Sequence, residues 1–146
     1  MKRLTVVFML VALFLAACGS DEPTPVPTVS LSLTATDIAY DTTRLEVTAG
    51  QPVRLTLNNE GALEHDFSIM AMPLTGDVLA EEMADEMAGH DMSSMEEEPE
   101  IHVAALTDGS NTIEFTPSEP GEYTYFCTVA GHKEAGMVGT LVVQAP

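Results

Sequence analysis

The chain has 146 residues, which is enough for one domain and too few for two of ordinary size. It carries 23 Asp and Glu residues against 5 Lys and Arg, a formal net charge of −18. Binding to nucleic acid or to an anionic lipid surface needs clustered cations, so this composition argues against both. An acidic surface serves either solubility or the attraction of a basic protein partner, and composition leaves these two open.

The first 17 residues have the organisation of a secretory signal peptide. Lys2 and Arg3 precede an apolar run from Leu4 to Ala17, which is shorter than the ~20 residues of a membrane span. The run ends in Leu-Ala-Ala followed by Cys18, which resembles the lipobox of bacterial lipoproteins. By that resemblance, Cys18 is the lipid attachment point of an exported protein that is anchored to a bacterial membrane and faces the periplasm or the cell exterior.

Residues 18–28 are predicted to be a tether that follows the lipidated cysteine. The segment from Gly19 to Thr28 is rich in proline and has one sizeable apolar side chain, Val26. Such a segment cannot bury a core and favours an extended spacer. The folded domain is therefore expected over residues 29–146.

From residue 29 onward, apolar and polar residues alternate with a period of two, which is typical of half-buried β-strands. Sequences rich in Asn, Asp, Gly and Pro separate these runs. Many short alternating strands predict an all-β fold, an antiparallel Greek-key β-sandwich. The strands are expected at 29–36, 44–48, 53–57, 65–70, 101–106, 112–116, 122–128 and 137–144.

An insertion rich in Met and acidic residues, over about 71–100, interrupts the alternation. It contains no Lys or Arg, so its carboxylates have no cationic partner within the segment. Leu79, Met83 and Met87 recur every four residues, which favours a short helix over about 77–88. On this interpretation the three side chains pack the insertion onto the sandwich.

Cys127 is the one remaining thiol once Cys18 carries lipid. A lone thiol outside the cytoplasm has no intramolecular disulfide partner, so it is either an inert buried side chain or a metal ligand. His132 and Met137 follow in the next loop, and His65 stands at the start of an earlier strand. One thiolate, two imidazoles and one weak thioether are the ligand types of a blue copper site.

The sequence around these residues resembles the cupredoxin family, the blue (type 1) copper proteins, and in particular its small plastocyanin- and azurin-like bacterial members. The likeness lies in Tyr125-Phe126-Cys127, in Gly131-His132 and in the run from Glu134 to Val143. It also includes His65-Asp66-Phe67, which follows the turn 58–61, and the approach to the cysteine strand at 115–123. The likeness covers nearly the whole domain apart from the insertion.

The resemblance implies one type 1 copper ion as cofactor. It makes His65, Cys127, His132 and Met137 the copper ligands. Hydrogen-bonded partners behind the ligands orient them and tune the metal, and the resemblance assigns this role to Asp66 and Thr128.

The resemblance further implies a one-electron carrier that is not an enzyme and has no small-molecule substrate. Its partners would be redox proteins, a cytochrome or a membrane oxidase or reductase. Electrons would pass at the edge of His132, within an apolar patch made of Ala62, Leu63, Val129, Ala130, Met137 and Val138.

The alternative is a copper-handling protein that stores or delivers the ion. Soft thioether and imidazole ligands in the insertion suit Cu(I), so they are candidates for accessory copper binding. These ligands are Met83, Met87, His90, Met92 and Met95.

Overall fold

The structure is a computed structural model that describes residues 26–81 and 98–146. Within these residues every regular element is a β-strand, so the predicted all-β fold is confirmed. The strands are β1 Val29–Thr36, β2 Ala39–Tyr40, β3 Arg44–Thr48, β4 Val53–Asn59, β5 His65–Ile69, β6 Leu79–Glu81, β7 Ile101–Ala105, β8 Ser110–Phe115, β9 Gly121–Phe126 and β10 Val138–Gln144.

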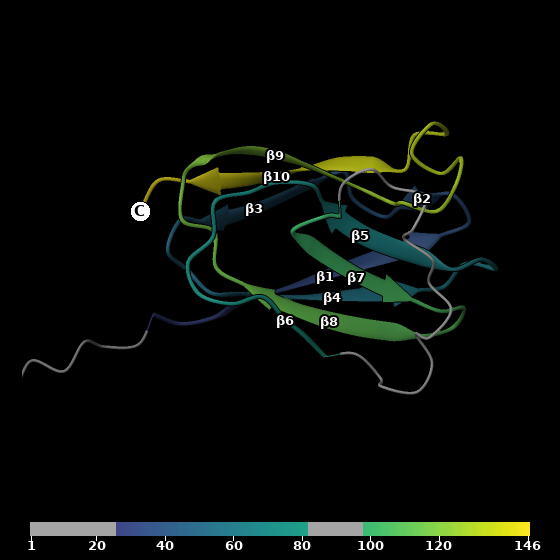
Figure 1. The fold of residues 1–146 in the computed structure, drawn as a ribbon. Helices are drawn as coiled ribbons and strands as arrows, with labels where there is room; N and C mark the ends of the chain where they lie inside the picture. Colours follow the sequence, from purple (N-terminus) through teal and green to yellow (C-terminus); the bar gives the residue numbers. More distant parts are fainter. Residues whose placement is uncertain (1–25, 82–97) are drawn as a thin grey trace, which may run out of the picture.

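The strands form two five-stranded sheets, in the orders β2-β1-β4-β8-β6 and β3-β10-β9-β5-β7. The sheets lie face to face as the two layers of a sandwich (Figure 1). Most neighbouring strands pair antiparallel, as expected, but β1 pairs with β4 and β10 pairs with β3 in parallel. Alternation determines which face of a strand is buried and carries no information on the direction of its neighbour, so the parallel pairs could not be predicted from it.

The core lies between the sheets and follows the alternation of the sequence. Along β4, for example, Val53, Leu55 and Leu57 are fully buried and the residues between them are half-buried. Tyr125 is fully buried in the other sheet, and its ring centroid lies 5.0 Å from that of Phe67. Close packing of this kind resists rearrangement, so the loops at the sheet ends start from a rigid frame.

The predicted helix over 77–88 is wrong in the part that the structure describes. Leu79–Glu81 form strand β6, which pairs antiparallel with β8 at the edge of the first sheet. Leu79 is 60% exposed, so it does not pack the insertion onto the sandwich. Three residues are too few to show a two-residue period, and pairing with β8 outweighs the weak helical spacing. The accessory candidates Met83, Met87, His90, Met92 and Met95 lie outside the described residues.

The described parts of the insertion, 71–81 and 98–100, are joined to the sandwich. The Thr75 N–H donates a hydrogen bond to the Thr116 carbonyl at 2.9 Å. Met72 packs in the core with 3% of its surface exposed, and its N–H donates to Glu100 Oε2 at 2.7 Å. The two ends of the insertion are therefore fixed on the fold.

The chain enters β1 at the end of the sandwich where the C-terminus also lies, and the loop after β9 is at the opposite end (Figure 1). Residues 1–17 and Cys18 lie outside the described part of the chain. Among the described residues, no helix has the length and apolar character needed to cross a membrane.

Candidate metal centre

Three of the predicted ligands meet at one end of the sandwich, although they come from two distant parts of the chain. His65 is the first residue of β5, Cys127 directly follows β9, and His132 lies in the next loop. One ligand atom from each of the three residues lies within 4.8 Å of the others. Cys127 Sγ is 3.4 Å from His132 Nδ1, and the two imidazole centroids are 5.0 Å apart. These side chains converge on a common point, as a shared metal ion requires.

The three side chains are shielded from solvent. His65 and Cys127 have no exposed surface, and His132 is 4% exposed. Both ring nitrogens of His65 are buried without a hydrogen-bond partner among the residues described. Leaving a buried polar group unpaired costs about 1–3 kcal/mol, and a bond from one nitrogen to a metal removes part of that cost. The buried thiol and imidazoles are the donor set that copper prefers, so the site fits this ion.

A series of turns holds His132 and Met137 against Cys127. The Cys127 N–H donates to the Met137 carbonyl at 3.2 Å, and the Met137 N–H donates to the His132 carbonyl at 3.0 Å. Gly136, directly before Met137, has a φ of 103°, a conformation that residues with a side chain rarely adopt. Met137 is fully buried. The backbone thus places Met137 beside two of the other predicted ligands, and its bond to copper stays a prediction.

Asp66 and Thr128, the predicted partners behind the ligands, are hydrogen-bonded to each other. The Thr128 N–H donates to both carboxylate oxygens of Asp66 at 3.0 Å, and Thr128 Oγ1 donates to Oδ2 at 2.7 Å. Asp66 is fully buried, and its Oδ2 lies 3.7 Å from Cys127 Sγ. Ser68 also donates to Asp66, at 2.8 Å, and the sequence interpretation missed this contact. Its signal was the i, i+2 spacing along one strand, which places both side chains on the same face.

Burial also shifts the acid–base behaviour of the metal-free site. Desolvation, followed by the charge of His132, lowers the pKa of His65. Desolvation, followed by the charge of Asp66, raises the pKa of Cys127 to about 12. The metal-free site therefore holds a neutral His65 and a protonated thiol. Because metals bind the thiolate, copper loading must displace this proton.

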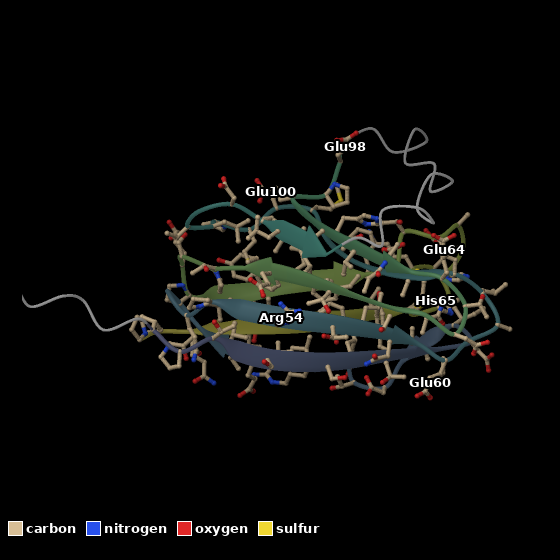
Figure 2. All side chains as sticks on the ribbon, turned by 90° about the horizontal axis from the view of Figure 1, so that it is seen from below. Arg54, Glu60, Glu64, His65, Glu98 and Glu100 are labelled. Atoms are coloured by element: carbon tan, nitrogen blue, oxygen red, sulfur yellow. The ribbon has the colours of Figure 1, made fainter. Side chains whose placement is uncertain are left out.

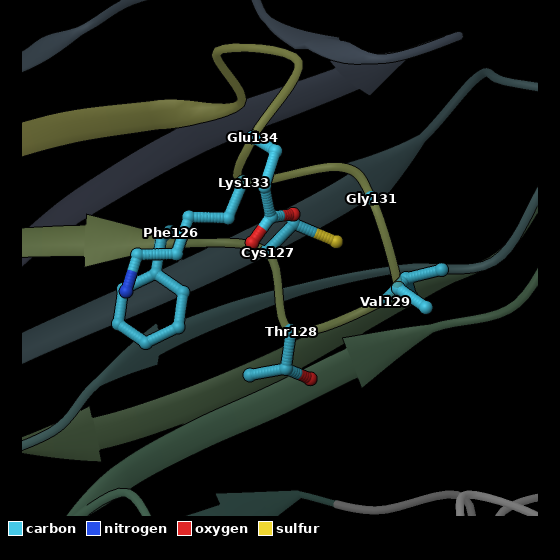
Figure 3. Close-up of a pocket in the computed structure, with 8 residues that line it drawn as sticks. Phe126, Cys127, Thr128, Val129, Gly131, Lys133 and Glu134 are labelled. Carbon is cyan, nitrogen blue, oxygen red and sulfur yellow. The ribbon is translucent and has the colours of Figure 1, made fainter.

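An open hollow of about 510 Å³ lies beside the loop that begins at Cys127 (Figure 3). Its walls come from the segment that starts at Phe126 and ends at Glu134. Lys133 reaches over the Phe126 ring, with Nζ 4.0 Å from the ring centroid. The Lys133 ammonium group thus covers the ring of Phe126, the residue before Cys127, and the sulfur of Cys127 stays buried.

The apolar surface patch predicted around His132 is present in part. Ala62, Leu63 and Ala130 are exposed, Leu63 by 50%. Met137 is fully buried, so its place in the patch is a prediction that the structure corrects. Ile38, in the turn between β1 and β2, is 42% exposed and lies beside the loop that leads to His65. The sequence did not predict Ile38 as part of the patch, because this turn is distant from His65 along the chain and close to it only in the folded structure.

Comparison with known proteins identifies the family. The model for copper-binding proteins of the plastocyanin/azurin family matches residues 27–144. The chain therefore belongs to this family, the cupredoxins, and its cofactor is one type 1 copper ion.

Two curated relatives and one solved structure illustrate the likeness. The copper-resistant cuproprotein CopI of Rubrivivax gelatinosus is 31% identical over 105 residues, which span 72% of this chain and 59% of CopI. The chain thus spans less than two thirds of that relative. Auracyanin-A of Chloroflexus aurantiacus is 30% identical, with 94% of this chain and 93% of that protein covered. The solved structure of auracyanin A, a "blue" copper protein from the same green thermophilic photosynthetic bacterium, is 25% identical with a TM-score of 0.58, covering 81% of this chain and 100% of that one.

Proposed function

We propose that this chain is a one-electron carrier, and not an enzyme, in which His65, Cys127, His132 and Met137 hold the copper ion. The bound ion supplies the Cu(II)/Cu(I) couple. The soft thiolate of Cys127 suits Cu(I), the imidazoles suit both oxidation states, and the thioether of Met137 is a weak additional ligand. The rigid sandwich holds these side chains in one arrangement, which keeps the rearrangement on electron transfer small.

The observation that carries this proposal is the burial of the ligands. His65, Cys127 and Met137 have no exposed surface, and only His132 retains a small exposed edge, 4% of its surface. An electron can cross such an edge, whereas release of the ion requires the loops to open. This arrangement supports electron exchange more than rapid copper delivery.

The surface at this end supports a redox protein as partner. Three exposed apolar residues, Ile38, Leu63 and Ala130, lie in loops at the end of the sandwich that holds His65 and His132. Glu60 and Glu64 lie at the same end of the molecule as His65 (Figure 2). Transient redox complexes use small interfaces, so we propose a partner with a small apolar face and a basic rim.

Electron exchange with a basic cytochrome tests both parts of the proposal. Copper-loaded full chain mixed with the reduced cytochrome should be reduced in a bimolecular reaction that slows as salt rises, because screening weakens attraction between opposite charges. Glu64→Gln should slow the reaction at low salt, and Glu46→Gln, on β3, is the matched control. A rate that is independent of salt and of Glu64 would contradict the partner assignment.

Copper handling is the second candidate, and the likeness to the copper-resistant cuproprotein CopI favours it. The ligands proposed for it are Met83, Met87, His90, Met92 and Met95. A titration with Cu(I) distinguishes the two functions. The carrier should bind one tightly held ion per chain, and replacing these five residues should leave that number unchanged. Several tightly bound ions, lost in the fivefold variant, would favour handling.

We further propose that the chain is exported by a signal peptide over 1–17 and anchored to a bacterial membrane by lipid on Cys18, with 18–28 as tether. The polypeptide enters the sandwich at the end opposite the copper ligands (Figure 1), which leaves those ligands facing away from the anchor. Such a tether raises the effective concentration of the domain near membrane partners. Cys18→Ser should move the protein from the membrane to the soluble fraction, and a variant that stays membrane-bound would contradict the anchor.

A further inference from the structure

A line of hydrogen bonds leads from the cysteine ligand to the edge of its sheet. Asp66 Oδ2 lies 3.7 Å from Cys127 Sγ, and Ser68 Oγ lies 2.8 Å from Asp66 Oδ1. Ser68 Oγ is also 2.9 Å from Nδ1 of His102. Ser68 on β5 and His102 on the edge strand β7 are directly opposite each other in the sheet. Asp66 and Ser68 are fully buried, and His102 is half-buried.

The chemistry of these groups fixes where the hydrogens lie. The carboxylate of Asp66 accepts hydrogen bonds from the Thr128 N–H, from Thr128 Oγ1 and from Ser68 Oγ. A serine hydroxyl has one hydrogen, and Ser68 uses it toward Asp66. The contact between Ser68 and His102 therefore needs a hydrogen on Nδ1 of the imidazole. His102 donates to Ser68, Ser68 donates to Asp66, and both dipoles point their positive ends at the buried carboxylate.

We infer that Ser68 and His102 are positioning residues for the copper site, which act on Cys127 through Asp66. This inference rests on copper being held by Cys127, as proposed above. Ser68 holds the carboxylate in place, His102 orients Ser68, and the two aligned dipoles compensate part of the carboxylate charge. In a buried setting this compensation matters, because a charge acts more strongly there than in water. Without the donors, the sulfur experiences a more negative environment, which favours Cu(II) over Cu(I).

The reduction potential of full-chain variants tests this inference. Ser68→Ala and His102→Leu should each shift the Cu(II)/Cu(I) ratio at a fixed applied potential about three- to tenfold toward Cu(II), where tenfold corresponds to about 59 mV for a one-electron couple. His102→Asn, which retains a side-chain N–H donor, should restore most of the potential. Thr124→Ala, an exposed position on β9, is the matched control and should leave the potential unchanged.

The double variant separates action through Ser68 from a general effect of His102. If His102 acts through Ser68, His102→Leu should add no further shift in the Ser68→Ala background. Fully additive shifts, or unchanged potentials in all variants with normal copper spectra, would overturn the inference and leave the proposed function standing. A chain that binds no copper would instead overturn the proposed function.

A measurement on the metal-free chain tests the hydrogen-bond direction without copper. Nitrogen-15 NMR of the His102 imidazole should show the hydrogen on Nδ1, and Ser68→Ala should change this signal to that of a solvent-exchanging ring. An Nδ1 that lacks the hydrogen in the unsubstituted chain would overturn the inference, because Ser68 would then have no hydrogen left for Asp66.

Discussion

At the scale of single residues, Asp66 is the charge with the shortest distance to Cys127, the predicted thiolate ligand, among the contacts described. Its carboxylate is fully buried, 3.7 Å from Cys127 Sγ, and is held by the N–H and hydroxyl of Thr128. A negative charge at this distance stabilises the more positive state of a bound ion. Asp66 should therefore keep the reduction potential lower than a neutral side chain of the same shape would.

Asp66→Asn tests this effect. Removing the charge while keeping the size and one acceptor oxygen should raise the reduction potential by on the order of 100 mV, as expected for a unit charge a few Å away at an effective dielectric constant of ~20. Voltammetry of the copper-loaded variant measures the shift. An unchanged or lower potential would contradict the role of the charge, and Glu46→Gln on β3 serves as the distant control.

Among single residues, the candidate ligands could be predicted from the sequence, and the hydrogen-bonded residues behind them only in part. His65, Cys127 and His132 could be picked out because their types and spacing are unusual together, and the structure brings them within 4.8 Å. The contact between Ser68 and His102 joins residues 34 positions apart, and neither residue is unusual on a strand. Such a pair depends on the register of β5 against β7, which a single sequence does not reveal.

At the scale of elements, strands with long alternating sequences were predictable. Very short strands, which form because a neighbouring strand pairs with them, were not. The run 29–36 coincides with β1, and 44–48 coincides with β3. The two-residue β2 and the three-residue β6 are too short to show a period, and each exists because a neighbouring strand pairs with it. The same lack of local signal explains the mistaken helix at β6.

The hairpin of β9 and β10 depends on one glycine. Gly139 lies opposite Tyr125, and a Cβ at this position would overlap the Tyr125 ring. The ring cannot easily move away, because it packs on Phe67 and its hydroxyl donates to the Thr42 carbonyl at 2.7 Å. This hairpin carries Cys127 at its end, so its packing supports the site.

Gly139→Ala should therefore lower the free energy of unfolding by about 1–3 kcal/mol, the usual cost of overpacking a core. Urea unfolding of the metal-free chain measures the change. Thr124→Ala, exposed on the same hairpin, should alter stability by less than about 0.5 kcal/mol. Equal stability of the Gly139 variant and the unsubstituted chain would contradict the packing described here.

At the scale of the whole molecule, the sandwich brings two distant parts of the domain sequence, His65 and the segment 127–137, together at one buried site. Burial has a cost that depends on pH in the metal-free chain. His65 has a lowered pKa, so unfolding takes up a proton below about pH 6.5, and stability should fall as pH falls through that range. Cys127 has a pKa raised from 9.0 to about 12, so the unfolded chain loses its proton first, and stability should fall as pH rises above about 9.

Unfolding measured from about pH 5 to pH 11 tests this dependence. The metal-free chain should be most stable between the two limits. Copper loading should remove the thiol's part of the alkaline loss, because the folded loaded chain already holds the thiolate. It should leave the acid loss in place, because unfolding still frees His65 to take up a proton. Burial also raises the pKa of Tyr125 to about 12, which adds to the alkaline loss. Cys127→Ala isolates the thiol and should reduce the alkaline loss. An alkaline loss that is equally steep in this variant would contradict the contribution of the thiol.

The central claim is that Cys127 and the two histidines hold one copper ion, and the combined visible and X-ray absorption spectrum of the loaded chain tests it most directly. The full chain should carry Cys18→Ser, so that Cys127 is the one thiol present. With one equivalent of copper we expect an intense thiolate-to-Cu(II) band, and one sulfur and two imidazole nitrogens bound to the copper ion. The band and the sulfur ligand should both be lost in Cys127→Ser. Copper bound through nitrogen and oxygen alone, or a blue band that survives Cys127→Ser, would contradict the account.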